Sequence, residues 1–138
     1  MRKIVIGGRG LVEGYGGGEL LVSPEPISFY GGVDPLTGVV REPNHPLEGK
    51  SIAGKILVFP RGKGSTVGSY VLLSLKDRGK APAGIVNIRS EPIIIVGCVL
   101  AEVPLMDRPD KNPLEVLKSG MWGRITVQGR KARLEVIP

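Results

Sequence analysis

The chain has 138 residues, of which 41% are hydrophobic, and this length and composition are typical of one globular domain with its own core. Its single cysteine, Cys98, excludes an intrachain disulfide, and its single histidine, His45, argues against a zinc site or a Ser-His triad built from this chain alone. The net charge of +6 would suit nucleic acid, but scattered basic residues and only 4% aromatic residues favour an acidic partner or a phosphorylated substrate instead.

Targeting signals are not visible in the sequence. No apolar run reaches the roughly 18 residues of a membrane-spanning helix, and the first residues lack the pattern of a signal peptide. We therefore expect a cytoplasmic protein that does not bind a membrane. Many prolines and few amide side chains hint at a thermophilic source.

The first half of the chain predicts short strands separated by glycine-rich turns. Residues 2–6 form an expected strand, and the glycine-dense stretch that ends at residue 18 predicts a hairpin or a broad loop. A dinucleotide-binding motif would need a helix directly after these glycines, but residues 19–22 have the pattern of another strand. Residues 41–52 are polar and proline-rich, as in an extended surface loop.

Between these segments lies a turn that allows two interpretations. Asp34 and the proline after it start a turn, and Gly38 suits a positive φ angle. The turn is either purely structural or a ligand contact, in which Gly31 and Gly32 allow close backbone approach and Asp34 accepts a hydrogen bond. The residues alone do not decide between the two.

The second half predicts a parallel crossover followed by a hairpin. Residues 55–59 form an expected buried strand, 67–75 a helix that ends before Gly79, and 82–88 the next strand. Ser90 is expected to cap a second short helix over residues 93–100, although this apolar run would also fit a buried strand. The remaining expected elements are a helix over residues 113–118 after Asn112, and strands over 124–127 and 132–136 joined by a turn at 128–129. We expect one α/β domain over residues 1–138 with mixed strands.

The junction between the buried strand and the first helix carries the clearest candidate site. Residues 62–66, Gly-Lys-Gly-Ser-Thr, lack the spacing of a nucleotide-binding P-loop. Ser65 could be a nucleophile, for which only His45 could serve as a base, or it could itself be a base stabilised by backbone N–H groups at the helix start. Alternatively, Ser65 or Thr66 only caps the helix. Gly62 and Gly64 leave the N–H groups accessible, and Lys63 adds positive charge.

Four segments together resemble the aconitase X family over nearly the whole chain; they are residues 17–23, 27–38, 62–66 and 97–104. The resemblance implies a swivelling β/β/α domain similar to the mobile domain of aconitase, with Ser65 as the base that removes the substrate proton. The wider superfamily has a carboxylate-binding arginine where this chain has Val67. The residues that we expect to contact substrate are Gly31, Gly32, Asp34, Gly62, Lys63, Gly64 and Thr66.

The resemblance also implies a reaction. It indicates the small subunit of a hydro-lyase that dehydrates (R)-5-phosphomevalonate to trans-anhydromevalonate 5-phosphate in an archaeal mevalonate pathway. One cysteine cannot hold the [4Fe-4S] cluster of such an enzyme, so we expect a large partner subunit to carry it and this chain to hold no metal. The alternatives are a subunit of a hydroxyproline-type aconitase X dehydratase, or a non-catalytic module that binds an anion or a partner.

Overall fold

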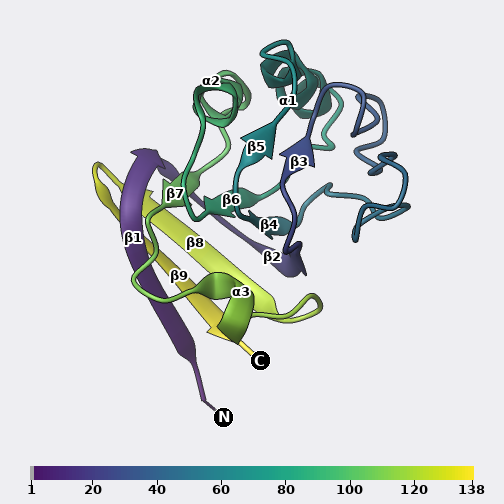
Figure 1. The fold of residues 1–138 in the computed structure, drawn as a ribbon. Helices are drawn as coiled ribbons and strands as arrows, with labels where there is room; N and C mark the ends of the chain where they lie inside the picture. Colours follow the sequence, from purple (N-terminus) through teal and green to yellow (C-terminus); the bar gives the residue numbers. More distant parts are fainter. Residues whose placement is uncertain (1) are drawn as a thin grey trace.

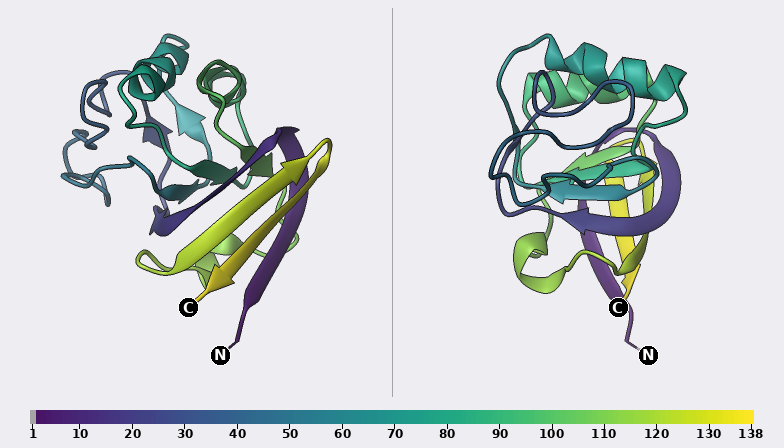
Figure 2. Two further views of the ribbon diagram at one scale, coloured as in Figure 1. Left: turned by 180° about the vertical axis from the view of Figure 1, so that it is seen from behind. Right: turned by 90° about the vertical axis from the view of Figure 1, so that its right-hand side faces the viewer.

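Seven strands close into a barrel in the computed structural model, which describes residues 2–138. Two helices, α1 (Gly68–Asp77) and α2 (Pro92–Ala101), lie side by side over one side of this barrel (Figures 1 and 2). A two-stranded sheet, β3 (Ile27–Ser28) with β5 (Gly62–Lys63), lies between the barrel and the helices, and the short helix α3 (Pro113–Val116) lies near the opposite end. In their order around the barrel the strands are β1 (Ile4–Val12), β7 (Leu105–Asp107), β6 (Gly84–Asn87), β4 (Ile56–Phe59), β2 (Gly14–Val22), β8 (Trp122–Gln128) and β9 (Lys131–Ile137).

The barrel combines a parallel half and an antiparallel half. Strands β2, β4, β6 and β7 are parallel neighbours, and the crossovers after β4 and β6 contain α1 and α2. Strands β1, β8 and β9 pair in antiparallel fashion and complete the circle. The predicted swivelling β/β/α domain with a C-terminal hairpin is therefore confirmed, as is the parallel crossover. Barrel closure itself was not predicted.

Two hydrophobic clusters follow from the alternation of side chains along the parallel strands. In β4, Ile56 and Val58 face the barrel interior, where they meet residues such as Ile125 and Leu134. Leu57 and Phe59 belong to the second cluster, which is shared with both helices. Because both faces of the strand are buried, it is a continuous apolar run rather than an alternating one.

The glycine-dense stretch is not the predicted hairpin or loop. Its glycines lie inside two nine-residue strands, β1 and β2, which pair with different neighbours rather than with each other. A Cβ atom at Gly18 would lie 2.3 Å from the backbone oxygen of Gly54, and one at Gly16 would lie 2.2 Å from that of Ala83. These glycines are therefore required for close strand packing, and the turn interpretation was wrong.

The other predicted elements occur with shifted ends. The first helix is confirmed, with Gly79 at φ 69° two residues after its end, and the run at 93–100 is helical as expected. Ser90 does not cap that helix: it is buried, its hydroxyl donates to Asn87 Oδ1 at 2.8 Å, and the capping position is Glu91. α3 ends two residues early, because Leu117 is extended and buried. The hairpin turn falls at residues 129–130. Among residues 2–138, no helix combines the length and apolar character needed to cross a membrane.

Candidate active site

The two predicted site motifs are neighbours in space although some thirty residues separate them in the chain. Strands β3 and β5 pair in parallel, with Ile27 opposite Gly62 and Ser28 opposite Lys63. Figure 1 shows this small sheet beneath the two helices. The pairing places the turn at residues 30–34 beside the loop at 62–66. A shallow depression of about 310 Å³ separates them, and its lining residues are Ser28, Tyr30, Gly31, Gly32, Glu42, Pro43, Lys63 and Gly64.

Ser65 is exposed at the positive end of α1. Its Oγ accepts a hydrogen bond from the Val67 N–H at 3.2 Å, and its carbonyl oxygen accepts one from the Gly68 N–H at 3.0 Å. The capping position of the helix is Val67, so neither Ser65 nor Thr66 occupies it. Thr66, also exposed, uses its carbonyl oxygen to accept from the Ser69 hydroxyl at 3.1 Å. The Ser65 hydroxyl is therefore accessible and has a backbone donor that would stabilise a negative charge on it.

The four predicted site glycines differ in why a side chain would or would not fit at their positions. A Cβ at Gly32 would lie 2.1 Å from the Ser28 carbonyl oxygen, and one at Gly64, where φ is 89°, would lie 2.4 Å from Ser28 Oγ. A Cβ at Gly62 would lie 2.7 Å from Ile94. Gly31, at φ 83°, has no atom within 4 Å of its missing Cβ. Gly32, Gly62 and Gly64 therefore allow close packing between segments of this chain. Among these four glycines, only Gly31 borders open space.

The carboxylate of Asp34 accepts hydrogen bonds from residues of its own loop. It is buried, its Oδ1 accepts from the Leu36 N–H at 2.8 Å, and its Oδ2 accepts from the Arg41 guanidinium. The hydrogen bond from Leu36, with further contributions from Thr37 and the charge of Arg41, lowers the pKa of Asp34. These contacts give Asp34 a turn-stabilising role. Its contact with substrate stays a prediction.

Asp34→Asn is expected to weaken the acid sensitivity of folding. Because the folded state lowers the pKa of Asp34, this carboxylate contributes stability above its unfolded pKa of about 3.9, and that contribution is lost as the pH falls. Urea unfolding at several pH values between 6 and 2 should therefore show a shallower loss for the variant than for the wild-type chain. Parallel curves for the two proteins would contradict this role.

The positive charge of Lys63, near Ser65, is partly neutralised by an ion pair, and both ring nitrogens of His45 have hydrogen-bond partners. Lys63 Nζ pairs with Glu42 Oε2 at 2.8 Å across the depression. His45 is buried, its Nδ1 accepts from the Leu47 N–H at 3.0 Å, and its Nε2 lies 3.0 Å from the Pro26 carbonyl oxygen. Both ring nitrogens are therefore used, which excludes His45 as the base of a serine nucleophile.

The residues that the structure describes do not fit an iron–sulfur cluster. Cys98 is fully buried, and burial raises the pKa of its thiol, so it is not a thiolate ligand. Within residues 2–138, no three side chains of the metal-ligating types gather at one place.

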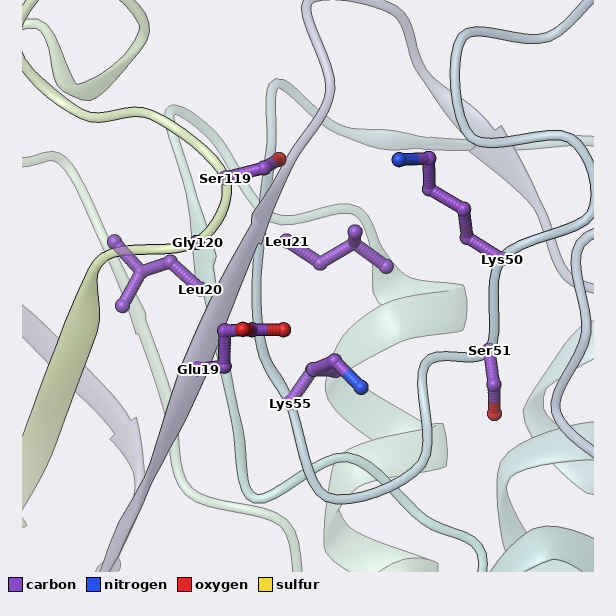
Figure 3. Close-up of a pocket in the computed structure, with 8 residues that line it drawn as sticks. All are labelled: Glu19, Leu20, Leu21, Lys50, Ser51, Lys55, Ser119 and Gly120. Atoms are coloured by element: carbon purple, nitrogen blue, oxygen red, sulfur yellow. The ribbon is translucent and has the colours of Figure 1, made fainter.

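A second depression, of about 420 Å³, lies at the opposite edge of the parallel strands. Figure 3 shows Glu19, Lys50 and Lys55 around it. Ser51 and Lys55 precede β4, whereas the loop with Ser65 follows its carboxyl end. In α/β sheets ligands bind beyond the carboxyl ends of parallel strands, so this hollow is not the candidate site.

Sequence reasoning gave no role to two arginines at that carboxyl edge. Arg89 and Arg108 are exposed and follow β6 and β7 closely, as Arg61 follows β4. Their position just after strands of a parallel crossover was the signal that could have identified them.

Comparisons with known proteins agree with this geometry. The model of the aconitase X swivel domain matches residues 5–136. The chain is 50% identical over 137 residues to the phosphomevalonate dehydratase small subunit of Methanosarcina acetivorans, covering 99% of this chain and 94% of the relative. It is 47% identical over 130 residues to the subunit of the same name from Pyrococcus furiosus, covering 94% and 93%. The crystal structure of Thermococcus kodakaraensis aconitase X in its holo-form superposes with a TM-score of 0.89 at 44% identity, covering 98% of this chain and 99% of that one. The chain therefore belongs to the aconitase X swivel-domain family.

Proposed function

We propose that this chain is the small subunit of a hydro-lyase that dehydrates (R)-5-phosphomevalonate to trans-anhydromevalonate 5-phosphate. The observation that carries the proposal is the exposed Ser65 at the positive end of α1, in a chain similar over 99% of its length to a phosphomevalonate dehydratase small subunit. The substrate is a phosphorylated acid, which suits the net charge of +6. Because such an acid does not cross membranes freely, we place the reaction in the cytoplasm.

Ser65 acts as the proton acceptor in this proposal. Its Oγ, as the alkoxide, takes the proton from the carbon next to the substrate carboxylate and becomes a hydroxyl. The electron pair forms the new double bond, and the neighbouring hydroxyl group departs as hydroxide, which is released as water after protonation by solvent. The Val67 N–H, 3.2 Å from Oγ, and the dipole of α1 stabilise negative charge on the oxygen. Gly31 leaves room for the substrate in the depression that borders the Ser65 loop, since nothing lies within 4 Å of its missing Cβ. Gly32, Asp34, Gly62, Lys63, Gly64 and Thr66 shape or flank the same pocket.

A larger partner subunit completes the site. We assign the [4Fe-4S] cluster to that partner, because the described residues of this chain offer no ligand set for it. Exposed apolar side chains border Ser65: Tyr30 is 58% exposed, Val67 47% and Tyr70 62%. Large apolar side chains beside a polar site are typical of a surface that another chain covers. They support a partner that closes over the depression.

Tyr70→Asp is expected to weaken association with the large subunit by about tenfold or more, because the buried side of an interface disfavours an unpaired charge. Tyr15→Asp is the matched control. Tyr15 is 83% exposed but lies on β2, opposite Thr126 of β8, away from the helix layer. The measurement is the dissociation constant of the two subunits by surface-immobilised binding. Equal loss in both variants would place the partner elsewhere.

Reconstitution with the large subunit tests the function directly. We expect the complex to convert (R)-5-phosphomevalonate and neither chain alone to do so. The same complex is to be offered hydroxyproline. Activity on hydroxyproline but not on (R)-5-phosphomevalonate would make the chain a subunit of a hydroxyproline dehydratase. A complex without activity on either substrate would favour a non-catalytic binding module.

A further inference from the structure

Three arginines gather at the carboxyl edge of the parallel strands, on the edge from which the Ser65 loop leaves the barrel. We propose that Arg61, Arg89 and Arg108 form the subsite that holds the phosphoryl group of the substrate. This inference rests on the proposed function and deepens it, since it names the residues that select a phosphorylated acid.

Strand register brings the three arginines together. Val58 of β4 is opposite Val86 of β6, and Val86 is opposite Met106 of β7, so the three strands end side by side. Beyond these ends, the Arg89 N–H donates to the carbonyl oxygen of Pro60, the residue before Arg61, at 3.2 Å. The Arg108 N–H donates to the carbonyl oxygen of Ile88, the residue before Arg89, at 3.0 Å.

Most N–H groups of the three guanidinium groups remain available to an anion. Among the described residues, Arg61 Nη1 donates to the Gly62 carbonyl oxygen at 3.2 Å. All three side chains are exposed, and within residues 2–138 none of them belongs to an ion pair. The acidic group nearest in sequence to Arg108 is Asp107, which is fully buried and bound to Arg9 at 2.8 and 2.9 Å. Its charge is thus already balanced. Glu91 and Asp110 also lie near in sequence, and Asp110 Oδ1 accepts from the Gly7 N–H at 3.2 Å. The edge therefore keeps an excess of positive charge.

The backbone of Arg108 adds to this argument. Arg108 has φ 49°, in the left-handed region that glycine and asparagine occupy at less cost. An arginine at such a position is stabilised by its surroundings, here by the anchored Asp107 before it and the hydrogen bond to Ile88. Beside it lies a hollow of about 350 Å³, which Ile88, Arg108, Pro109, Asp110, Lys111, Asn112 and Pro113 line.

The chain length between Arg61 and Ser65 is compatible with the length of the substrate. Ser65 is the fourth residue after Arg61, which limits their Cα atoms to at most about 14 Å apart. Five covalent bonds separate the phosphorus of 5-phosphomevalonate from the carbon that loses the proton, a span of roughly 6 Å. An extended arginine side chain covers most of the difference. A phosphoryl group held by Arg61 is therefore compatible with the acidic carbon reaching Ser65.

The number of arginines favours phosphate over carboxylate. A carboxylate is satisfied by one bidentate arginine, whereas a phosphate monoester carries up to two charges and three free oxygens. The alternative occupants of this edge are the carboxylate of the substrate and an acidic surface of the partner subunit. The experiment distinguishes both from a phosphoryl group.

The test uses the reconstituted two-subunit enzyme with Arg61→Gln, Arg89→Gln and Arg108→Gln. The quantity is the ratio of kcat/KM for (R)-5-phosphomevalonate to that for unphosphorylated mevalonate. Each substitution is expected to lower this ratio by about 10- to 100-fold, as for one charge-assisted hydrogen bond, with partial rescue by lysine. Arg78→Gln is the matched control, because Arg78 is exposed and unpaired among the described residues but follows the other end of α1.

Two other outcomes of the kinetic test overturn the proposal. Equal losses on both acids would make the edge a carboxylate site, and weaker subunit association at unchanged ratio would make it a partner contact. If the wild-type complex acts on an unphosphorylated substrate class, the proposed function fails by itself. The full chain alone then still tests the subsite. Inorganic phosphate should shift the backbone amide NMR signals of residues 61, 89 and 108 in the wild-type chain and not in the triple variant, and unshifted wild-type signals would refute anion binding.

Discussion

Ser65→Ala is expected to lower the turnover of the reconstituted enzyme by about 10²–10⁴, the usual contribution of a general base. The side chain lost is a small exposed hydroxyl whose only hydrogen bond among the described residues comes from the Val67 N–H at 3.2 Å. Folding and subunit association should therefore be nearly unchanged. Steady-state kinetics give the turnover, and the subunit dissociation constant shows that the complex still forms.

A matched substitution separates the loss of a base from a general effect on α1. Ser74→Ala removes a hydroxyl within α1, one that donates to the Pro35 carbonyl oxygen at 3.1 Å. It should keep turnover within a few-fold of wild type. Ser65→Thr retains a hydroxyl and is expected to keep part of the activity. Near-wild-type turnover in Ser65→Ala would remove Ser65 from the mechanism.

Asp107→Ala is expected to lower the free energy of unfolding by about 3 kcal/mol. Asp107 is fully buried at the end of β7 and accepts three hydrogen bonds, two from Arg9 at 2.8 and 2.9 Å and one from the Ser90 N–H at 2.9 Å. Alanine leaves the buried Ser90 N–H without its acceptor and Arg9 without its partner. The Arg9 side chain is 39% exposed, so water limits the cost to the lower end of the range for buried pairs.

Urea denaturation of the chain measures this free energy. Asp107→Asn keeps the size of the side chain and an acceptor for Ser90 but removes the charge, so its loss should be smaller. Asp77→Ala, at the exposed last residue of α1, serves as the control and should change stability by less than about 0.5 kcal/mol. A loss below 1 kcal/mol in Asp107→Ala would show that Arg9 and Ser90 are satisfied by water instead.

Local patterns predicted the elements whose signal lies in consecutive residues. The apolar run at 55–59, the helical spacing of Val71, Leu72 and Leu75, and the alternation at 132–136 each correspond to one element. Strands were correctly predicted at residues 2–6 and 19–22, which overlap β1 and β2. The glycine-dense stretch between them was misread, because its glycines serve contacts with distant backbone at Ala83 and Gly54. No pattern within a strand contains that information. Barrel closure was missed for the same reason, since it depends on the pairing of β1 with β9.

The candidate site was predicted in part. Residues 62–66 identified the loop and its place before α1, and the resemblance to aconitase X, a family now confirmed, pointed to Ser65. The partners within the site depend on tertiary structure: Glu42 binds Lys63 across the depression, and Arg41 binds Asp34. The arginines at 89 and 108 stand alone in the sequence and become neighbours of Arg61 only through the strand register.

The pairing of β1 with β9 has a practical consequence for every binding measurement above. Ile4 lies opposite Val136, so the two ends of the chain leave the barrel together, on the side away from α1 and α2 (Figure 1). A tag or surface anchor joined to either end is therefore held apart from the Ser65 loop and the arginine edge. The chain can be immobilised through either end while its functional edge faces the solution.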